Sequence, residues 1–217
     1  MLFRSGLGCV FIGQPLVEAT VTLKNFLTWQ KTMNYSLDEI CLQMCQKLIV
    51  RLMQNIPIVL SNHKLTVIFS APNKDSNTMD LWKMVKENLK GCEFDEIQIE
   101  NGKIHDCKGC SFKTCLHYAK QNSCFYGGYI VESVFPSIER ADIIVWLCPN
   151  NNDALSANIT AMINRLTVLY RKINFQSKNI FCIIVSGNSG SDSIAKQLIG
   201  ALNINKGFRL PRGAFLL

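Results

Sequence analysis

The feature that most constrains the fold is a regular alternation of apolar, strand-length runs with helical segments. Two of these runs, residues 142–148 and 179–186, are almost continuously apolar, which is typical of strands covered on both faces. An amphipathic helix pattern follows each of them, over residues 155–169 and 194–202. Strands that alternate with helices predict a parallel sheet with right-handed crossovers, so we expect an α/β fold.

The alternation begins upstream of these two units. A β-branched run at residues 65–70 predicts a strand, and apolar side chains at helical spacing predict a helix over residues 76–89. An alternating and more exposed strand is expected over residues 93–100. Helical spacing returns over residues 130–139, a segment that contains Pro136. The cysteine-bearing segment between the last two elements is interpreted as a loop.

The N-terminal part of the chain has a different pattern. Ser36 and Glu39 match a capping box, and an apolar face at helical spacing continues to about residue 54. We therefore predict an α/β domain over residues 61–217, preceded by an N-terminal helical extension over residues 1–60. The extension contains one amphipathic helix.

The last unit of the α/β domain is expected to be incomplete. Fifteen residues follow Leu202, and they have room for one short strand and no further helix. A sheet edge left in this way needs cover, because unpaired strand edges associate with other chains. We expect the N-terminal helix or a second subunit to supply that cover.

Composition excludes several protein classes. The chain is 48% hydrophobic with ordinary glycine and proline contents, which excludes disorder, collagen and low complexity. No apolar run approaches the ~20 residues of a membrane helix, and the N-terminus has no clear signal-peptide cleavage site. A cytoplasmic protein without a membrane partner is expected. The net charge of +7 is spread along the chain rather than gathered in a stripe, so nucleic acid is not an expected partner.

The ten cysteines fall into two groups. Six are scattered among apolar neighbours and are interpreted as buried packing thiols: Cys9, Cys41, Cys45, Cys92, Cys148 and Cys182. Four lie close together and are candidate metal ligands: Cys107, Cys110, Cys115 and Cys124. Their spacing is compatible with an iron-sulfur cluster, a tetrahedral zinc ion or redox-active thiols. The surrounding lysines at positions 103, 108, 113 and 120 suit all three alternatives equally.

Polar loops follow three of the predicted strands. Ligands of parallel sheets bind beyond the carboxyl ends of the strands, so we expect these loops to form one site. Residues 70–78 combine hydroxyls, amides and a lysine with a helix N-terminus, which suits a phosphate monoester. Residues 149–153 and 186–190 supply asparagines and glycines, which suit a flat heterocycle with hydrogen-bonding edges.

These segments resemble the flavodoxin-like NAD(P)H-dependent FMN oxidoreductases, a family that includes the iron-sulfur flavoproteins. The similarity extends from about residue 65 to about residue 210. It is carried by SAPNKDSNT, by DCKGCSFKTC with the later Cys124, by IERADIIVWLCPNNNDALSANITAMINR and by VSGNSG. The resemblance implies a flavodoxin-like three-layer αβα sandwich with sheet order 2-1-3-4-5. It also implies bound FMN, NAD(P)H as co-substrate and, from the iron-sulfur members, a possible [4Fe-4S] cluster.

The resemblance further implies which residues bind the cofactor. Those expected at the FMN phosphate are Ser70, Lys74, Ser76, Asn77 and Thr78. Those expected along the isoalloxazine ring are Pro149, Asn150, Asn151 and Asn152, with Ser186, Gly187, Asn188 and Gly190 at its other edge. No catalytic side chain is expected, because the flavin itself carries the chemistry. In the iron-sulfur members the second and third cysteines are separated by two residues, whereas four residues separate Cys110 and Cys115 here.

The function expected first is an enzyme, an FMN-dependent NAD(P)H oxidoreductase that passes electrons through flavin to a small-molecule or protein acceptor. One alternative is an iron-sulfur flavoprotein that carries electrons between proteins. Another is a non-redox interaction module with a flavodoxin-like fold. A homo-oligomer is expected in each case.

Overall fold

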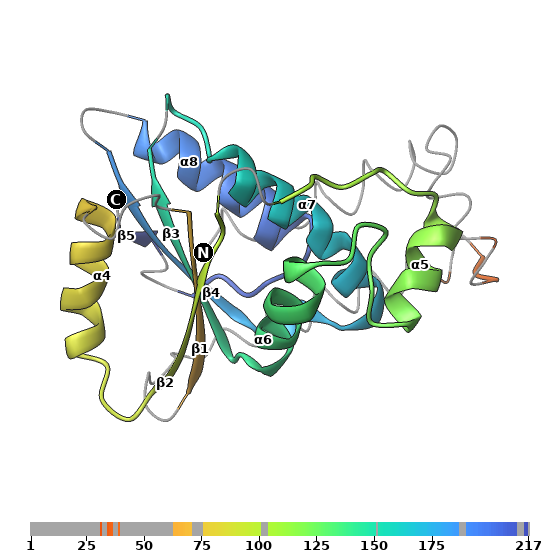
Figure 1. Cartoon of the computed structure of the whole chain (residues 1–217), viewed down its shortest axis with the longest axis horizontal. Coiled ribbons are helices and arrows are strands. Elements are labelled where there is room, and N and C mark those ends of the chain that lie inside the picture. The colour runs from red at the N-terminus through yellow and green to blue at the C-terminus, as the bar shows by residue number, and fades with distance from the viewer. Residues whose placement is uncertain are drawn as a thin grey trace.

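A computed structural model describes residues 31, 34–36, 39, 63–70, 76–100, 104–150, 152–186, 190–211 and 215–216. Within them, parallel strands form one sheet in the order β2-β1-β3-β4-β5. The strands are β1 (Lys64–Phe69), β2 (Glu93–Gln98), β3 (Ile143–Pro149), β4 (Asn179–Val185) and β5 (Phe215–Leu216). The predicted α/β class and sheet order are therefore confirmed (Figure 1).

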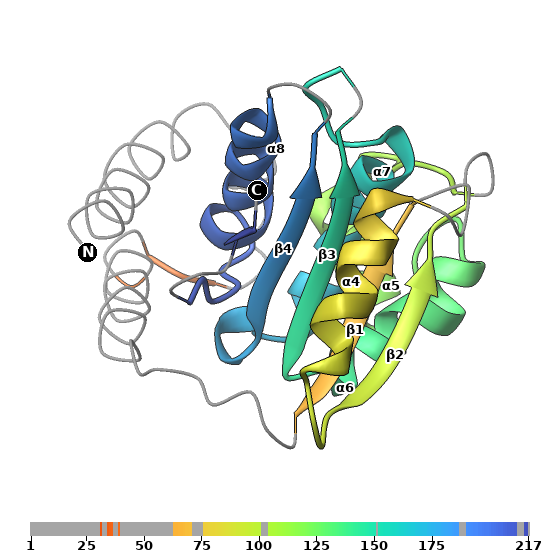
Figure 2. The same ribbon diagram turned by 90° about the vertical axis from the view of Figure 1, so that its left-hand side faces the viewer.

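Helices cover both faces of this sheet. They are α4 (Asn77–Glu87), α5 (Phe112–Lys120), α6 (Phe135–Arg140), α7 (Ala157–Lys172) and α8 (Ser191–Leu198). Shorter turns are the π-helical η1 (Ile130–Val134) and η3 (Ile199–Ile204) and the 3-10 turn η2 (Phe175–Ser177). Figure 1 shows α4 on one side of the sheet and α6 and α7 on the other, and Figure 2 shows α4 in front of β1 and β3. No helix in the described part of the chain is long and apolar enough to cross a membrane.

Two hydrophobic clusters form because side chains alternate across each strand. Val67 and Val145 pack under α4, where Trp82 is 1% exposed. Ile144 and Trp146 point to the opposite face and join the larger cluster with α6, α7 and α8. β3 is buried on both faces along nearly its whole length, as its continuous apolar sequence predicts.

Two predicted helices contain π-helical turns. The segment predicted at residues 130–139 starts as η1 and continues as α6, with Pro136 in the first turn of α6. The Phe135 N–H donates to the Ile130 carbonyl five residues back, so Pro136 lies at the junction between the π-helical turn and α6. The helix predicted at residues 194–202 is α8 followed by η3.

The interpretation of residues 101–124 as a loop was wrong in part, because α5 lies within it. Ser111 caps this helix by accepting a hydrogen bond from the Thr114 N–H at 3.3 Å. Phe112, Cys115 and Ala119 form its buried face. Their spacing of three and four residues is helical, but in the sequence it coincides with a cysteine spacing that also indicates a ligand loop.

At the N-terminus, the predicted capping box is present. The Glu39 carboxylate accepts from the Ser36 N–H at 2.6 Å, and Ser36 Oγ accepts from the Glu39 N–H at 3.2 Å. Residues 40–62, which would complete the predicted helix, lie outside the described residues. The division into an extension and a domain stays a prediction.

β5 is the short last strand that the sequence predicts. It pairs in parallel with Cys182 and Ile183 of β4. The predicted cover for this edge, by the N-terminal helix or by a second subunit, stays a prediction.

Candidate cofactor site at the carboxyl edge of the sheet

The first predicted loop joins β1 to α4. Ser70 follows β1 directly and is 5% exposed. Ser76 is the N-cap of α4, and its Oγ accepts from the Met79 N–H at 3.2 Å. Asn77 and Thr78 open the helix, where the first N–H groups lack acceptors within the helix and the helix dipole favours an anion. Lys74 lies outside the described residues.

The start of α7 borders this first loop. Ser156 precedes the helix, and its hydroxyl donates to Ser70 Oγ at 2.9 Å. Asn158 in the first turn donates its amide to the carbonyl of Ile99, just beyond β2. Its Oδ1 is buried without a hydrogen-bond partner in the described structure. A buried acceptor of this kind requires a donor, which a ligand or an ordered water can supply.

The second and third loops contact each other directly. Asn150 follows β3, and its N–H donates to the carbonyl of Val185 at 2.9 Å. Its Nδ2 donates to Ser186 Oγ, also at 2.9 Å. Pro149 is the last residue of β3, and Asn152 is exposed with a positive φ of 53°. The predicted meeting of the loops at one sheet edge is therefore found for the residues that the structure describes. Asn151, Gly187 and Asn188 lie outside them.

Four side chains at this edge were not assigned a cofactor contact from the sequence, although the second predicted loop includes or precedes three of them. They are Asp153, Ser156, Asn158 and Gln197. The first three lie within or next to the predicted Asn-rich loop, so the polar run was a usable signal. Gln197 lies on α8 and accepts from the Leu155 N–H at 3.2 Å across 42 residues of sequence. A contact over that separation leaves no local pattern.

The four clustered cysteines are all free thiols, with different environments. Cys107 is exposed and Cys110 half-buried, whereas Cys115 and Cys124 belong to the hydrophobic core. Burial raises the pKa of the Cys115 thiol, and the Arg171 guanidinium opposes that shift. Among the described residues, no three Cys, His, Asp or Glu side chains are arranged to hold a metal ion. The arrangement therefore does not support the predicted cluster or zinc site, which stays a prediction.

The basic residues near these thiols differ from those that the sequence singles out. Lys206, from the segment after η3, is 5% exposed, and burial lowers its pKa to about 8. Arg171 of α7 lies over the Phe112 ring at 4.6 Å. Of the lysines in the cysteine segment, Lys108 lies 3.5 Å from the centre of the Phe125 ring, which is a cation–π contact.

The scattered cysteines that the structure describes behave largely as predicted. Cys148 in β3 and Cys182 in β4 are 2% and 1% exposed. Burial raises the pKa of Cys148 to about 12. Cys92 is half-buried, and Cys9, Cys41 and Cys45 lie outside the described residues.

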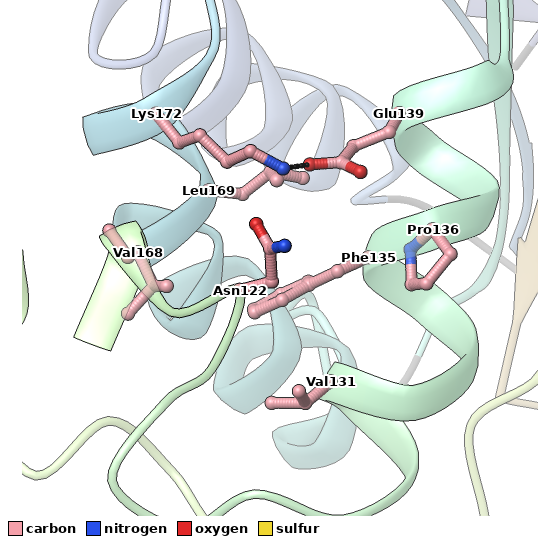
Figure 3. Close-up of a pocket in the computed structure, with 9 residues that line it drawn as sticks. Asn122, Val131, Phe135, Pro136, Glu139, Val168, Leu169 and Lys172 are labelled. Carbon is pink, nitrogen blue, oxygen red and sulfur yellow. Dashed lines mark hydrogen bonds and ion pairs between the residues drawn. The ribbon is translucent and has the colours of Figure 1, made fainter.

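A cavity of about 130 Å³ lies away from the strand ends. It is formed by α6, the C-terminal half of α7 and the end of α5 (Figure 3). Lys172 and Glu139 make an ion pair at 2.6 Å on its rim, and Figure 3 shows Asn122 between this pair and the Phe135 ring. The candidate cofactor site lies at the opposite end of α7, where Ser156 and Asn158 are, so the cavity is separate from it.

A sequence model of the NADPH-dependent FMN reductase family matches residues 63–217. The chain belongs to this family. Membership makes it an NAD(P)H-dependent FMN reductase-like enzyme, and the family resemblance inferred from the sequence is confirmed. No protein with a curated function matches the sequence significantly.

Solved structures agree on the fold. An NAD(P)H:quinone oxidoreductase from Methanothermobacter marburgensis is 12% identical with a TM-score of 0.54, over 72% of this chain and 83% of that one. A putative quinone reductase from Klebsiella pneumoniae is 14% identical with a TM-score of 0.51, over 68% and 73%. RosB, solved with 8-demethyl-8-formylriboflavin-5'-phosphate, is 13% identical with a TM-score of 0.51, over 70% of this chain. The match spans 63% of the RosB chain. These likenesses show a flavodoxin-like fold.

The residues present at the sheet edge fit the FMN that an FMN reductase binds. The N-terminus of α4 and the hydroxyls of Ser70 and Ser76 suit a phosphate. The unpaired Oδ1 of Asn158 is an acceptor that a ligand donor could satisfy. Asn150 and Ser186 already form a hydrogen-bonded pair of the kind that lines a polar ring edge.

Proposed function

We propose that this FMN reductase binds FMN across the loops after β1, β3 and β4 and oxidises NAD(P)H there. The observation that supports the proposal is a set of side-chain hydrogen bonds between the segments that follow these strands. The Ser156 and Ser70 hydroxyls join α7 to the first loop at 2.9 Å, and Asn150 with Ser186 joins the other two at 2.9 Å. Polar groups from distant parts of the chain thus gather where parallel sheets bind their ligands.

In this proposal each loop has a separate task. Ser70, Lys74 and the start of α4 from Ser76 to Thr78 hold the phosphate, because that helix end offers N–H donors and a positive dipole. The loops that begin at Pro149 and at Ser186 hold the ring and fix its orientation. When bound, FMN supplies the redox chemistry, accepting hydride from the nicotinamide and passing electrons on.

The phosphate assignment can be tested by comparing FMN with riboflavin, which lacks the phosphate. Wild-type protein should bind FMN much more tightly than riboflavin. Ser76→Ala removes a hydroxyl and the N-cap of α4, so it should weaken FMN binding about tenfold and leave riboflavin binding almost unchanged. Flavin fluorescence quenching measures both affinities. Equal losses for the two ligands would place the effect elsewhere than the phosphate.

Turnover with a soluble electron acceptor distinguishes the proposed enzyme from an electron carrier. With FMN bound, the enzyme should oxidise NADPH or NADH and reduce a soluble quinone in a steady state. A protein carrier would be reduced by one equivalent and would turn over negligibly with soluble acceptors. The interaction module would bind neither flavin nor nicotinamide. Stopped-flow absorbance of flavin and nicotinamide distinguishes the three outcomes.

The cysteine segment requires its own measurement. Iron, sulfide and zinc analysis of protein purified without oxygen distinguishes the three predicted states of the four cysteines: an iron-sulfur cluster, a zinc ion or free thiols. Two cations close to the thiols, the buried Lys206 and the half-buried Arg171, would offset the charge of thiolates in any of the predicted states. The quadruple variant with Cys107, Cys110, Cys115 and Cys124 changed to Ser should retain FMN binding, because the residues proposed to hold FMN lie in the loops after β1, β3 and β4 and none of the four cysteines does.

A further inference from the structure

Gly190 makes an unusually close approach to the loop after β3. It is the N-cap of α8 and has a φ of 90°, a conformation that side-chain-bearing residues rarely adopt. A Cβ atom built on it would overlap the carboxylate of Asp153 and lie 3.0 Å from Asn150 Nδ2. The glycine is therefore required by contact as well as by backbone conformation.

Asp153 lies at the centre of the contacts between these loops. Its Oδ1 accepts from Asn150 Nδ2 at 3.1 Å, and its N–H donates to Asn150 Oδ1 at 2.8 Å. The same Asn150 Nδ2 donates to Ser186 Oγ at 2.9 Å. The carbonyl of Asp153 accepts from Gln197 Nε2 of α8 at 3.1 Å. Asp153 thereby connects the loop after β3 to α8 directly, and to the end of β4 through Asn150.

The backbone of the same loop is held in an unfavourable conformation. Asn152 and Asp153 have φ values of 53° and 58°, and both are non-glycine residues. Consecutive left-handed residues persist only where their surroundings fix them. Asp153 is held in this conformation by the hydrogen bond that its N–H donates to Asn150 Oδ1 and by the one that its carbonyl accepts from Gln197 Nε2.

We propose that Asp153 is a positioning residue of the flavin site, which fixes the orientation in which Asn150 is presented to the ring. It bonds Asn150 directly, reaches Ser186 through Asn150 and packs against Gly190, and we call these contacts the clamp. This inference rests on the proposed FMN site. The clamp is complete without ligand, so the loop should lose little conformational entropy when FMN binds. Asp153 itself acts through Asn150 and takes no part in hydride transfer.

A double-mutant cycle tests the clamp. Asp153→Ala removes a charge-assisted hydrogen bond and should weaken FMN binding about tenfold. Gly190→Ala should weaken it at least as much, because its methyl group displaces Asp153. In the Asp153→Ala background the overlap with the Asp153 carboxylate is gone, and the positive φ and the Asn150 Nδ2 contact remain. Gly190→Ala should therefore cost less than in wild type, only ~3-fold more. Additive losses would overturn the direct coupling.

A conservative variant separates positioning from a general loss of structure. Asp153→Asn keeps an acceptor for Asn150 Nδ2 and should restore FMN affinity to within ~3-fold of wild type. Asp192→Ala serves as the matched control. It removes an exposed carboxylate from α8, the helix that Gly190 caps, and this carboxylate pairs with Lys196 at 2.8 Å. It should leave the affinity unchanged. If Asp153→Ala lowers only the thermal stability and binds FMN normally, the positioning role is wrong.

The same cycle is measured on flavin-free protein by urea unfolding. Since the contacts exist without ligand, Asp153→Ala and Gly190→Ala should also be non-additive in the unfolding free energy. Wild-type protein that does not bind FMN would overturn the proposed function, whereas additive effects in the apoprotein would overturn the clamp. The two failures are thus distinguished.

Discussion

Cys148 is the residue whose burial makes the clearest pH prediction. It lies inside β3 at 2% exposure, and burial raises its pKa from 9.0 to about 12. A thiol whose folded pKa is raised stabilises the fold fully below pH 9, and that contribution is lost as pH rises toward 12. Between pH 8 and pH 11 the stability gap between wild type and Cys148→Ala should narrow by about 2–3 kcal/mol. Urea unfolding at each pH measures it.

The control for this prediction is a core variant without an ionisable group. Ile144 lies on the same strand and is equally buried. The difference in unfolding free energy between wild type and Ile144→Ala should therefore stay constant with pH. If the difference in unfolding free energy from wild type narrows equally for both variants, the loss of stability at high pH comes from groups other than Cys148. A constant gap for Cys148→Ala would contradict the assigned burial of its thiol.

At the scale of elements, the packing of α4 on its sheet face includes one large and fully buried side chain. Trp82 is 1% exposed, and its Nε1 donates to Glu96 Oε1 on β2 at 2.9 Å. Trp82→Ala should therefore lower the unfolding free energy by about 3–5 kcal/mol. Met84, two residues along the same helix, is 63% exposed, and Met84→Ala should change stability by less than about 0.5 kcal/mol. Equal effects in urea unfolding would mean that α4 is packed differently.

α5 shows the limit of local sequence patterns at this scale. Its buried positions Phe112, Cys115 and Ala119 have helical spacing, but the cysteine spacing indicates a ligand loop instead. Ser111→Ala removes its N-cap and should cost about 1 kcal/mol of stability. Far-UV circular dichroism during urea unfolding measures the loss. No effect would argue that α5 contributes little to the folded state.

At the scale of the whole molecule, FMN should stabilise a protein that already folds without it. The hydrogen bonds of Asn150 to Ser186 and of Ser156 to Ser70 are complete in the ligand-free chain. Ligand that binds only the native state at 100 times its Kd adds about 2.7 kcal/mol to the unfolding free energy. Thermal unfolding with and without FMN tests this, with adenosine monophosphate as a phosphate-bearing control that should have little effect.

The sequence by itself determined the α/β class, the strand order through the family resemblance, and the three polar strand ends. It did so because continuous apolar runs, helical periodicity and capping residues are local physical signals. The resemblance, carried by short motifs at the strand ends, also indicates the FMN reductase family to which the chain belongs. Ser76 as the N-cap of α4 and the Ser36–Glu39 capping box are each predicted correctly from a few adjacent residues.

Only the tertiary structure decided which polar residues meet and how. Asp153 contacts Gly190 across 37 positions, and Gln197 reaches the Asp153 carbonyl across 44. The burial of Lys206 near the cysteines depends likewise on a segment far away in sequence. These contacts arise when crossovers bring distant strand ends to one edge of the sheet. Such long-range contacts produce no periodic pattern in the sequence, because they depend on how distant segments pack and not on the residues next to each partner in the chain.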